Sequence, residues 1–133
     1  MGNKKIKIGI IGVGNCASSL IQGLDYYGRA TASRSIGLLH KSMGPYTLGN
    51  IECVSAFDVD KQKVGKDISE AIFTTPNCTL KFCNVPFKNV IVHKSQIFDS
   101  LNGNLNKIIR IDPRQKPENI SSVLQDSGTE ILI

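Results

Sequence analysis

The chain has 133 residues, of which 41% are hydrophobic and 20% charged, and its formal net charge is +5 at pH 7. This length predicts one domain with an apolar core. The lysines and arginines are scattered, and no apolar stretch is long enough to cross a bilayer, so we expect neither a nucleic-acid partner nor a membrane partner. The first apolar run contains glycines and lacks a cleavage site, which favours a cytoplasmic protein over a secreted one.

The cysteines and histidines predict neither a disulfide framework nor a metal site. Without a secretory signal, all four cysteines are expected to be free thiols. Cys78 and Cys83 lack the close spacing of a zinc-binding pair, and His93 follows ten residues later. His40 and His93 are isolated histidines, for which we expect no catalytic role.

The first predicted elements are a buried strand over residues 5–11 and a helix that follows it. Isoleucines dominate the strand, as is typical of a strand buried on both faces in the middle of a sheet. The helix is expected to begin with Asn15 as its N-cap and to end with Gly28 as its C-cap. Its apolar positions follow helical spacing: Ala17, Leu20, Ile21, Leu24 and Tyr27.

The residues between this strand and this helix form a G-x-G-x-x-A pattern, which we call the glycine turn (residues 12–17). Gly12 permits a tight turn, Gly14 lets the backbone approach a pyrophosphate, and Ala17 lets the helix pack on the strand. The free N–H groups and positive dipole of the helix N-terminus favour a diphosphate there. The pattern therefore predicts dinucleotide binding, and the alternative is a plain strand-to-helix turn without a ligand.

The second strand, over residues 51–57, follows an irregular insertion at residues 29–50. Asp58 comes directly after this strand, where a carboxylate accepts from the adenosine ribose and repels the 2′-phosphate of NADP. It lies 44 positions after Gly14, well beyond the usual ~20, which weakens the pattern. Asp60 is expected to cap a second helix, whose apolar positions are Val64, Ile68, Ala71 and Ile72.

The remaining chain predicts two more strands and one helix. Prolines break residues 74–88, which hold at most a short edge strand at residues 79–82, and a third strand follows at residues 89–93. Residues 94–116 look irregular. Pro117 is expected to open a helix that Gly128 ends, with Ile120, Val123 and Leu124 facing inward. A fourth strand is predicted over residues 129–133.

Together these elements predict an α/β protein with a Rossmann-like, doubly wound, mainly parallel sheet of about four strands. We expect a single NAD(P)-binding domain over residues 1–133. Because a complete dinucleotide site takes two βαβαβ halves, a strand at the last residues indicates an incomplete domain, the N-terminal portion of a larger enzyme.

Several motifs carry a resemblance to a known family. They include residues 11–20, Gln22-Gly23, Tyr26-Tyr27, Gly37-Leu38 with His40, Gly44-Pro45-Tyr46, residues 56–60, Lys63-Val64-Gly65, residues 67–73 and residues 89–92. In this order and spacing, insertion included, they resemble the N-terminal part of inositol-1-phosphate (myo-inositol 3-phosphate) synthase of the bacterial and archaeal type.

The resemblance implies a cofactor, a reaction and a set of binding residues. Such synthases bind NAD and convert glucose 6-phosphate to inositol phosphate, for inositol and phospholipid biosynthesis, by internal oxidation, aldol closure and reduction. Carried over by position, the pyrophosphate is lined by Gly12, Val13, Gly14, Asn15, Cys16 and Ala17. Asp58 holds the adenosine ribose, and Asp67 is a second acidic position near the cofactor.

The resemblance also limits what this chain is expected to do alone. The family's catalytic lysines, its substrate-phosphate contacts and much of the sheet that forms its tetramer follow the matched portion, so no catalytic residue is named here. Glucose 6-phosphate is expected to bind only with that missing half, and a homo-oligomer is expected. The alternatives are a non-enzymatic nucleotide-binding module, an inactive truncated relative or, least favoured, a basic nucleic-acid-binding domain.

Overall fold

The protein is described here by a computed structural model, which describes residues 4–29, 35–98, 101 and 103–133. Within these residues, one sheet of four parallel strands forms the centre of the fold, in the order β3-β2-β1-β4. The strands are β1 (Ile6–Ile11), β2 (Ile51–Asp58), β3 (Val92–Lys94) and β4 (Ile131–Leu132).

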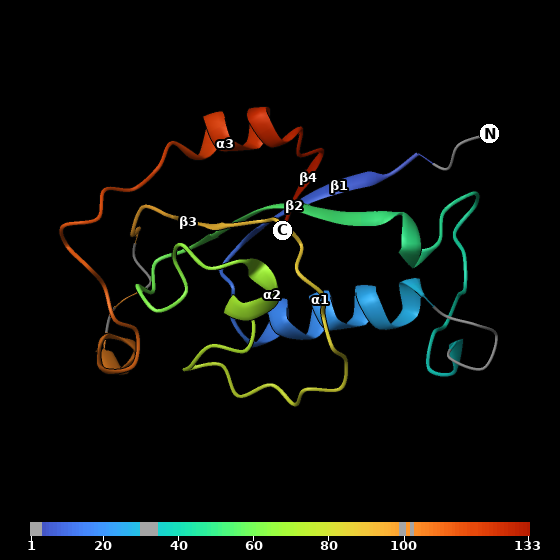
Figure 1. Cartoon of the computed structure of the whole chain (residues 1–133), viewed down its shortest axis with the longest axis horizontal. Coiled ribbons are helices and arrows are strands. Elements are labelled where there is room, and N and C mark those ends of the chain that lie inside the picture. Colours follow the sequence, from blue (N-terminus) through green and yellow to red (C-terminus); the bar gives the residue numbers. More distant parts are fainter. Residues whose placement is uncertain (1–3, 30–34, 99–100, 102) are drawn as a thin grey trace.

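Helices cover both faces of this sheet. Figure 1 shows α1 (Asn15–Gly28) and α2 (Ile68–Ala71) on one side of the strands and α3 (Ile120–Ser127) on the other. This arrangement confirms the predicted α/β class with a mainly parallel sheet, and the strand order is that of the first half of a Rossmann-like fold.

The core of the molecule lies around the two central strands. Ile8 and Ile10 of β1 are each 3% exposed, and Ala56 and Phe57 of β2 are fully buried. The prediction of a central, doubly covered first strand is therefore confirmed. Near the carboxyl ends of the two strands, Ile11 lies opposite Phe57, so the residue that follows each strand sits at the same edge of the sheet.

Helix α1 packs on the sheet through Ala17 and Ile21, which are both buried, as the helical spacing predicts. Its start differs from the prediction, because the N-cap is Gly14 and Asn15 is already the first helical residue. The Asn15 side chain is used elsewhere: its Oδ1 accepts from the backbone N–H of Cys78 at 2.8 Å. A tertiary contact thus replaces the expected local cap.

The end of α1 also differs from the prediction. Gly28 is the last helical residue, and Arg29 follows as the C-cap with a φ of −98°, so no left-handed glycine ends this helix. Instead, a Cβ on Gly28 would lie 3.4 Å from the Cα of Gly49. The glycine lets the backbone at the end of α1 pass close to the turn (Leu48–Asn50) that leads into β2.

The second predicted helix is much shorter than expected, and Asp60 does not cap it. The chain turns at residues 61–65, where the N–H groups of Lys63 and Val64 bond back to the Asp60 carbonyl. Gly65 then adopts a φ of +86°, which interrupts a right-handed helix. Helix α2 spans only Ile68–Ala71, and its N-cap is Asp67, whose carboxylate accepts from the Ser69 N–H.

The predicted edge strand at residues 79–82 is absent from the sheet, since residues 77–88 contain no strand. The buried side chain of Gln22 holds this segment against α1 instead. Its Oε1 accepts from the N–H groups of Phe82 and Cys83 at 2.8 and 3.2 Å, and its Nε2 donates to the Leu80 carbonyl at 3.2 Å. The backbone of the segment therefore bonds to a helix side chain rather than to a strand.

The other connections are largely irregular, as expected. Residues 35–50 contain the short 3-10 turn before β2 and no longer element, while residues 30–34 of the predicted insertion lie outside the described residues. A second 3-10 turn occupies Gly103–Lys107.

The last helix and strand are present near their predicted places. Helix α3 begins after Asn119, whose side chain accepts from the Ser122 N–H, so Pro117 precedes the helix rather than opening it. Gly128, with a φ of +65°, is the left-handed C-cap that the sequence predicts. The apolar residues Ile120, Val123 and Leu124 are half-buried, and β4 pairs with β1 over two residues.

Candidate functional site

The glycine turn lies at the carboxyl edge of the sheet, between the end of β1 and the start of α1. Gly12 has a φ of +97°, which L side chains rarely adopt, and its N–H donates to the Phe57 carbonyl at 2.8 Å. Gly14 has an ordinary φ of −91°. A Cβ added to Gly12 or to Gly14 would meet no atom within 4 Å, so the described residues leave the space beside both glycines open.

Asp58 lies beside this turn and is bonded to it directly. The backbone N–H of Val13 donates to Asp58 Oδ2 at 2.8 Å, and both residues are buried. The other oxygen, Oδ1, accepts from the N–H groups of Val59 and Asp60, both at 2.8 Å. The structure therefore brings together the turn and the acidic residue that the sequence places 44 positions after Gly14.

Two further polar side chains, Lys63 and Asn77, bond to the backbone of the turn. Sequence reasoning did not identify either of them as a site residue. Lys63 is 4% exposed, and its Nζ donates to the Val13 carbonyl and to Asn77 Oδ1, both at 2.9 Å. Asn77 Nδ2 donates to the same carbonyl at 3.0 Å. Lys63 Nζ also lies 3.9 Å from Asp58 Oδ2, so a buried ion pair lies under the turn. Their spacing gives no periodic signal that would have revealed them.

The first turn of α1 carries the other residues that were predicted to line the pyrophosphate. Asn15 and Cys16 are exposed, and Ala17 is buried against the sheet. None of the described residues accepts from the backbone N–H of Gly14, Asn15 or Cys16, which is the usual state of the first donors of a helix. The Asn15 side chain fixes the neighbouring segment through Thr79 as well, since Thr79 Oγ1 donates to Asn15 Oδ1 at 2.9 Å.

Asp67 lies at the start of α2, and its carboxylate holds the chain segment that leads into β3. It accepts from the Ser69 N–H at 2.9 Å, the Lys88 N–H at 3.2 Å and the Val90 N–H at 2.9 Å. Burial opposes the charge, but these bonds and the Ser69 hydroxyl outweigh it and lower the pKa of Asp67 below its ordinary 3.8. Within the described residues these contacts are structural, and a role toward a cofactor stays a prediction.

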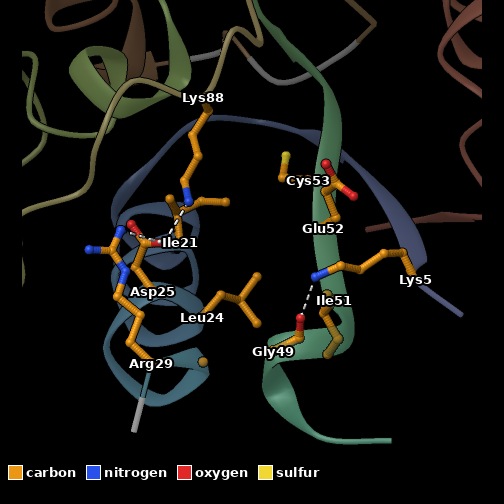
Figure 2. Close-up of a pocket in the computed structure, with 11 residues that line it drawn as sticks. Lys5, Ile21, Leu24, Asp25, Arg29, Gly49, Ile51, Glu52, Cys53 and Lys88 are labelled. Atoms are coloured by element: carbon orange, nitrogen blue, oxygen red, sulfur yellow. Dashed lines mark hydrogen bonds and ion pairs between the residues drawn. The ribbon is translucent and has the colours of Figure 1, made fainter. Parts of the chain in front are cut away.

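A pocket of about 310 Å³ lies at a different place, between the second half of α1 and the first residues of β2. Figure 2 shows Lys88 facing Asp25 across its upper part, where Lys88 Nζ and Asp25 Oδ1 are 2.5 Å apart, while Lys5 donates to the Gly49 carbonyl. These residues lie at the amino end of β2, whereas ligands of open α/β sheets bind outside the carboxyl ends. We therefore place the candidate site at the glycine turn and not in this pocket.

All four cysteines are free thiols in the structure. Among the described residues, no group of three or more His, Cys, Asp or Glu side chains is placed to hold a metal ion. His93 Nδ1 lies 2.8 Å from Glu118 Oε2, and burial raises the pKa of the Cys53 thiol to about 11. In the part of the chain that the structure describes, no helix is both long and apolar enough to cross a membrane.

Comparison with known proteins supports the family resemblance. No protein-family model matches the chain. An inositol-3-phosphate synthase of Mycolicibacterium smegmatis is 39% identical over 130 residues, which are 97% of this chain and 36% of that protein. One of Corynebacterium glutamicum is 38% identical over 134 residues, covering 100% of this chain and 37% of that protein. The chain resembles the N-terminal part of inositol-3-phosphate synthase. It spans about a third of the length of these synthases.

Two solved structures share the fold of this chain. The crystal structure of Ari2 superposes with a TM-score of 0.74 at 24% identity, over 97% of this chain and 37% of that one. A myo-inositol-1-phosphate synthase-related protein from Thermotoga maritima gives a TM-score of 0.60 at 18% identity, over 96% of this chain and 33% of that one. At these identities the likeness concerns the fold alone, and it confirms the predicted Rossmann-like class.

Proposed function

We propose that this chain is the NAD-binding portion of an inositol-3-phosphate synthase, an enzyme that converts glucose 6-phosphate to inositol phosphate. The resemblance to named synthases supports the family. The hydrogen bond from Val13 N–H to Asp58 Oδ2 carries the cofactor part of the proposal. It joins the two elements that a dinucleotide site needs, a phosphate-binding turn and a ribose-binding acid, at the carboxyl edge of the sheet.

The glycine turn fits a pyrophosphate. The strained φ of Gly12 explains that glycine within the chain itself, but Gly14 has an ordinary φ and open space where a Cβ would lie. A ligand that approaches the backbone closely accounts for the second glycine. The N–H groups of Gly14, Asn15 and Cys16, which donate to no acceptor among the described residues, supply donors for phosphate oxygens. Val13 and Ala17 hold the turn and the helix in place.

Asp58 fits one ribose hydroxyl and excludes an additional phosphate. A carboxylate offers about four lone-pair sites, and three backbone N–H groups already donate to Asp58. One site on Oδ2 remains for a hydroxyl of the adenosine ribose. Because a 2′-phosphate would bring two negative charges against this buried carboxylate, we propose NAD rather than NADP as the cofactor.

NAD, when bound, supplies hydride acceptance and return, and the residues of this chain bind and orient it. The glycine turn of the chain fixes the diphosphate, and Asp58 fixes the ribose. Together these two contacts determine where the nicotinamide end of NAD lies. We assign no general acid or base among the described residues. Binding of glucose 6-phosphate and a cytoplasmic location are part of the same proposal.

Self-association is a separate part of this proposal. We propose a homo-oligomer, which is tetrameric in the family that the chain resembles. The exposed residues Ile131 and Leu132 of β4, an edge strand, favour contact with further polypeptide. Light scattering coupled to size exclusion tests it: a mass that stays that of one chain at high protein concentration contradicts it.

A titration tests the cofactor, and an activity measurement tests the reaction. Calorimetry with NAD, NADP and a DNA duplex should show saturable binding of NAD, much weaker binding of NADP and no binding of the duplex. Salt-dependent duplex binding without NAD binding would overturn the proposal. Inositol phosphate formation from glucose 6-phosphate should appear only when the remainder of a related synthase is supplied, and its absence then would contradict the enzymatic part alone.

A further inference from the structure

Val13, the middle residue of the glycine turn, is held by side chains at both of its peptide groups. Its N–H donates to Asp58 Oδ2 at 2.8 Å. Its carbonyl accepts from Lys63 Nζ at 2.9 Å and from Asn77 Nδ2 at 3.0 Å. Asp58 ends β2, and Lys63 and Asn77 follow it in the chain. The end of β2 and the region after it therefore determine the conformation of the turn after β1.

The hydrogen bonds from Lys63 and Asn77 to the Val13 carbonyl fix the direction of the Gly14 N–H. The Val13–Gly14 peptide is planar and trans, so its C=O and N–H point in opposite directions. Lys63 and Asn77 draw the carbonyl inward, toward the buried side of the turn, since Val13 is fully buried and Lys63 is 4% exposed. The Gly14 N–H therefore points away from Lys63 and Asn77, and none of the described residues accepts from it.

Lys63 also places a positive charge under the turn. A buried ammonium is unfavourable unless it is paired and hydrogen-bonded. Lys63 meets this condition through the Val13 carbonyl, Asn77 Oδ1 and the Asp58 carboxylate 3.9 Å away. The charge is held one peptide group away from the Gly14 N–H, and screening by salt is weak at a buried site.

We propose that Lys63 is a positioning residue for the pyrophosphate of a bound dinucleotide. It aims the Gly14 N–H at a phosphate oxygen and holds a positive charge behind that donor. Asn77 assists by holding the same carbonyl without contributing charge. This inference rests on the proposed NAD binding and adds to it a residue that does not touch the cofactor.

The test compares Lys63→Met with Lys88→Met in the 133-residue chain. Both changes remove one ammonium that is paired with an aspartate, but Lys88 pairs with Asp25 at the opposite edge of the sheet. Dissociation constants are measured for NAD, ADP and adenosine, and the Gly14 cross-peak is followed in ¹⁵N-labelled protein. When a hydrogen-bond donor no longer points at its charged acceptor, the affinity falls about tenfold or more.

The expected result is that Lys63→Met weakens NAD and ADP by the same factor, leaves adenosine unchanged and shifts the Gly14 cross-peak before any ligand is added. Lys88→Met should leave all three affinities and the Gly14 cross-peak as in the unmodified chain. If Lys63→Met does not fold, Asn77→Ala is used instead, because it keeps the Lys63 charge and removes one hydrogen bond to the Val13 carbonyl. It should shift Gly14 and weaken NAD and ADP less than tenfold.

Three outcomes overturn the inference. If Lys63→Met is folded and binds NAD normally, Lys63 does not position the pyrophosphate. If adenosine weakens as much as NAD does, or if Asn77→Ala leaves Gly14 and the NAD affinity unchanged, the role of these side chains is only structural. In these cases the unmodified chain still binds NAD, so the proposed function stands. An unmodified chain without saturable NAD binding overturns the proposed function as well.

Discussion

The backbone N–H of Val13 lies 2.8 Å from Asp58 Oδ2, although 45 residues separate them in the chain. The parallel pairing of β1 with β2, which sets Ile11 opposite Phe57, brings these two residues together. The insertion between α1 and β2 does not change this geometry, since the entropy of closing a loop grows only slowly with its length. A long gap between a glycine turn and its acidic partner is therefore compatible with a dinucleotide site.

The first prediction concerns Asp58. Asp58→Asn replaces one acceptor oxygen by an NH₂ group, so at least one backbone N–H loses its partner and the free energy of unfolding should fall by about 1–3 kcal/mol. The affinity for NAD should fall roughly tenfold because a charged acceptor of the ribose hydroxyl is lost. NADP should lose less affinity, or gain some. Urea unfolding and calorimetry check both effects.

The matched control is Asp126→Asn, which removes the same charge from an exposed position on α3. Stability and both affinities should stay close to those of the unmodified chain. A folded Asp58→Asn protein that still prefers NAD over NADP by the original factor would show that Asp58 does not select the cofactor.

The second prediction separates the two glycines of the turn. Gly12→Ala forces a side chain into a φ near +97° and should lower the free energy of unfolding by about 1–2 kcal/mol or more. Gly14→Ala adds a Cβ to open space at an ordinary φ, so stability should change by less than about 1 kcal/mol. Its NAD affinity should nevertheless fall at least about tenfold, since the methyl group occupies the space of the phosphate. Equal NAD affinity in Gly14→Ala contradicts a close phosphate approach.

The sequence was sufficient for the elements that local patterns control. The isoleucine run of β1, the apolar spacing of α1 and the left-handed glycine at residue 128 all depend on near neighbours, and the structure confirms each of them. Asp58 was placed correctly at the end of β2 because strand ends follow from the same patterns. The role of each candidate site residue toward a cofactor stays a prediction.

The features that sequence reasoning missed depend on tertiary contacts between polar side chains. Asn15 was expected to cap its own helix, but it bonds to Cys78 and Thr79 instead. Gln22 holds residues 80–83 away from the sheet, where a strand was expected, and Lys63 is buried under the turn. A buried polar residue has no periodic signature, and only the fold determines which partner it meets.

The third prediction is a pH dependence of stability at Asp67. Its pKa is lowered in the folded state, so its contribution is fully present above the ordinary value of 3.8 and is lost as the pH falls through the lower folded value. Near neutral pH, Asp67→Asn should unfold more easily by about 1–3 kcal/mol, because several N–H donors lose a charged acceptor. The difference should shrink in acid, as urea unfolding at several pH values would show.

Glu70→Gln serves as the control for this series, since the Glu70 side chain is 65% exposed and, among the described residues, forms a surface ion pair with Lys66 alone. Its stability should follow that of the unmodified chain at every pH. If the loss of unfolding free energy in Asp67→Asn is the same from neutral to acid pH, the charge of the Asp67 carboxylate contributes nothing to stability.

The fourth prediction concerns thiol reactivity. Cys16 and Cys78 are exposed, whereas burial raises the pKa of Cys53 to about 11. At about pH 8 iodoacetamide should therefore label Cys16 and Cys78 quickly and Cys53 hardly at all. NAD should protect Cys16, on the first turn of α1, and leave half-buried Cys83 unaffected. Mass spectrometry of peptides measures the labelling of each cysteine. If Cys16 is labelled at the same rate with and without saturating NAD, the proposed position of the pyrophosphate is contradicted.

The position of bound NAD is the central claim, and amide chemical shifts test it most directly. In ¹⁵N-labelled protein, NAD should move the resonances of the glycine turn (residues 12–17) and of Asp58 in a saturable manner. The amides of Lys5, Cys53 and Lys88, which line the pocket at the other edge of the sheet, should stay unchanged. Shifts confined to the pocket residues, or no saturable shift at any residue, would contradict NAD binding at the turn.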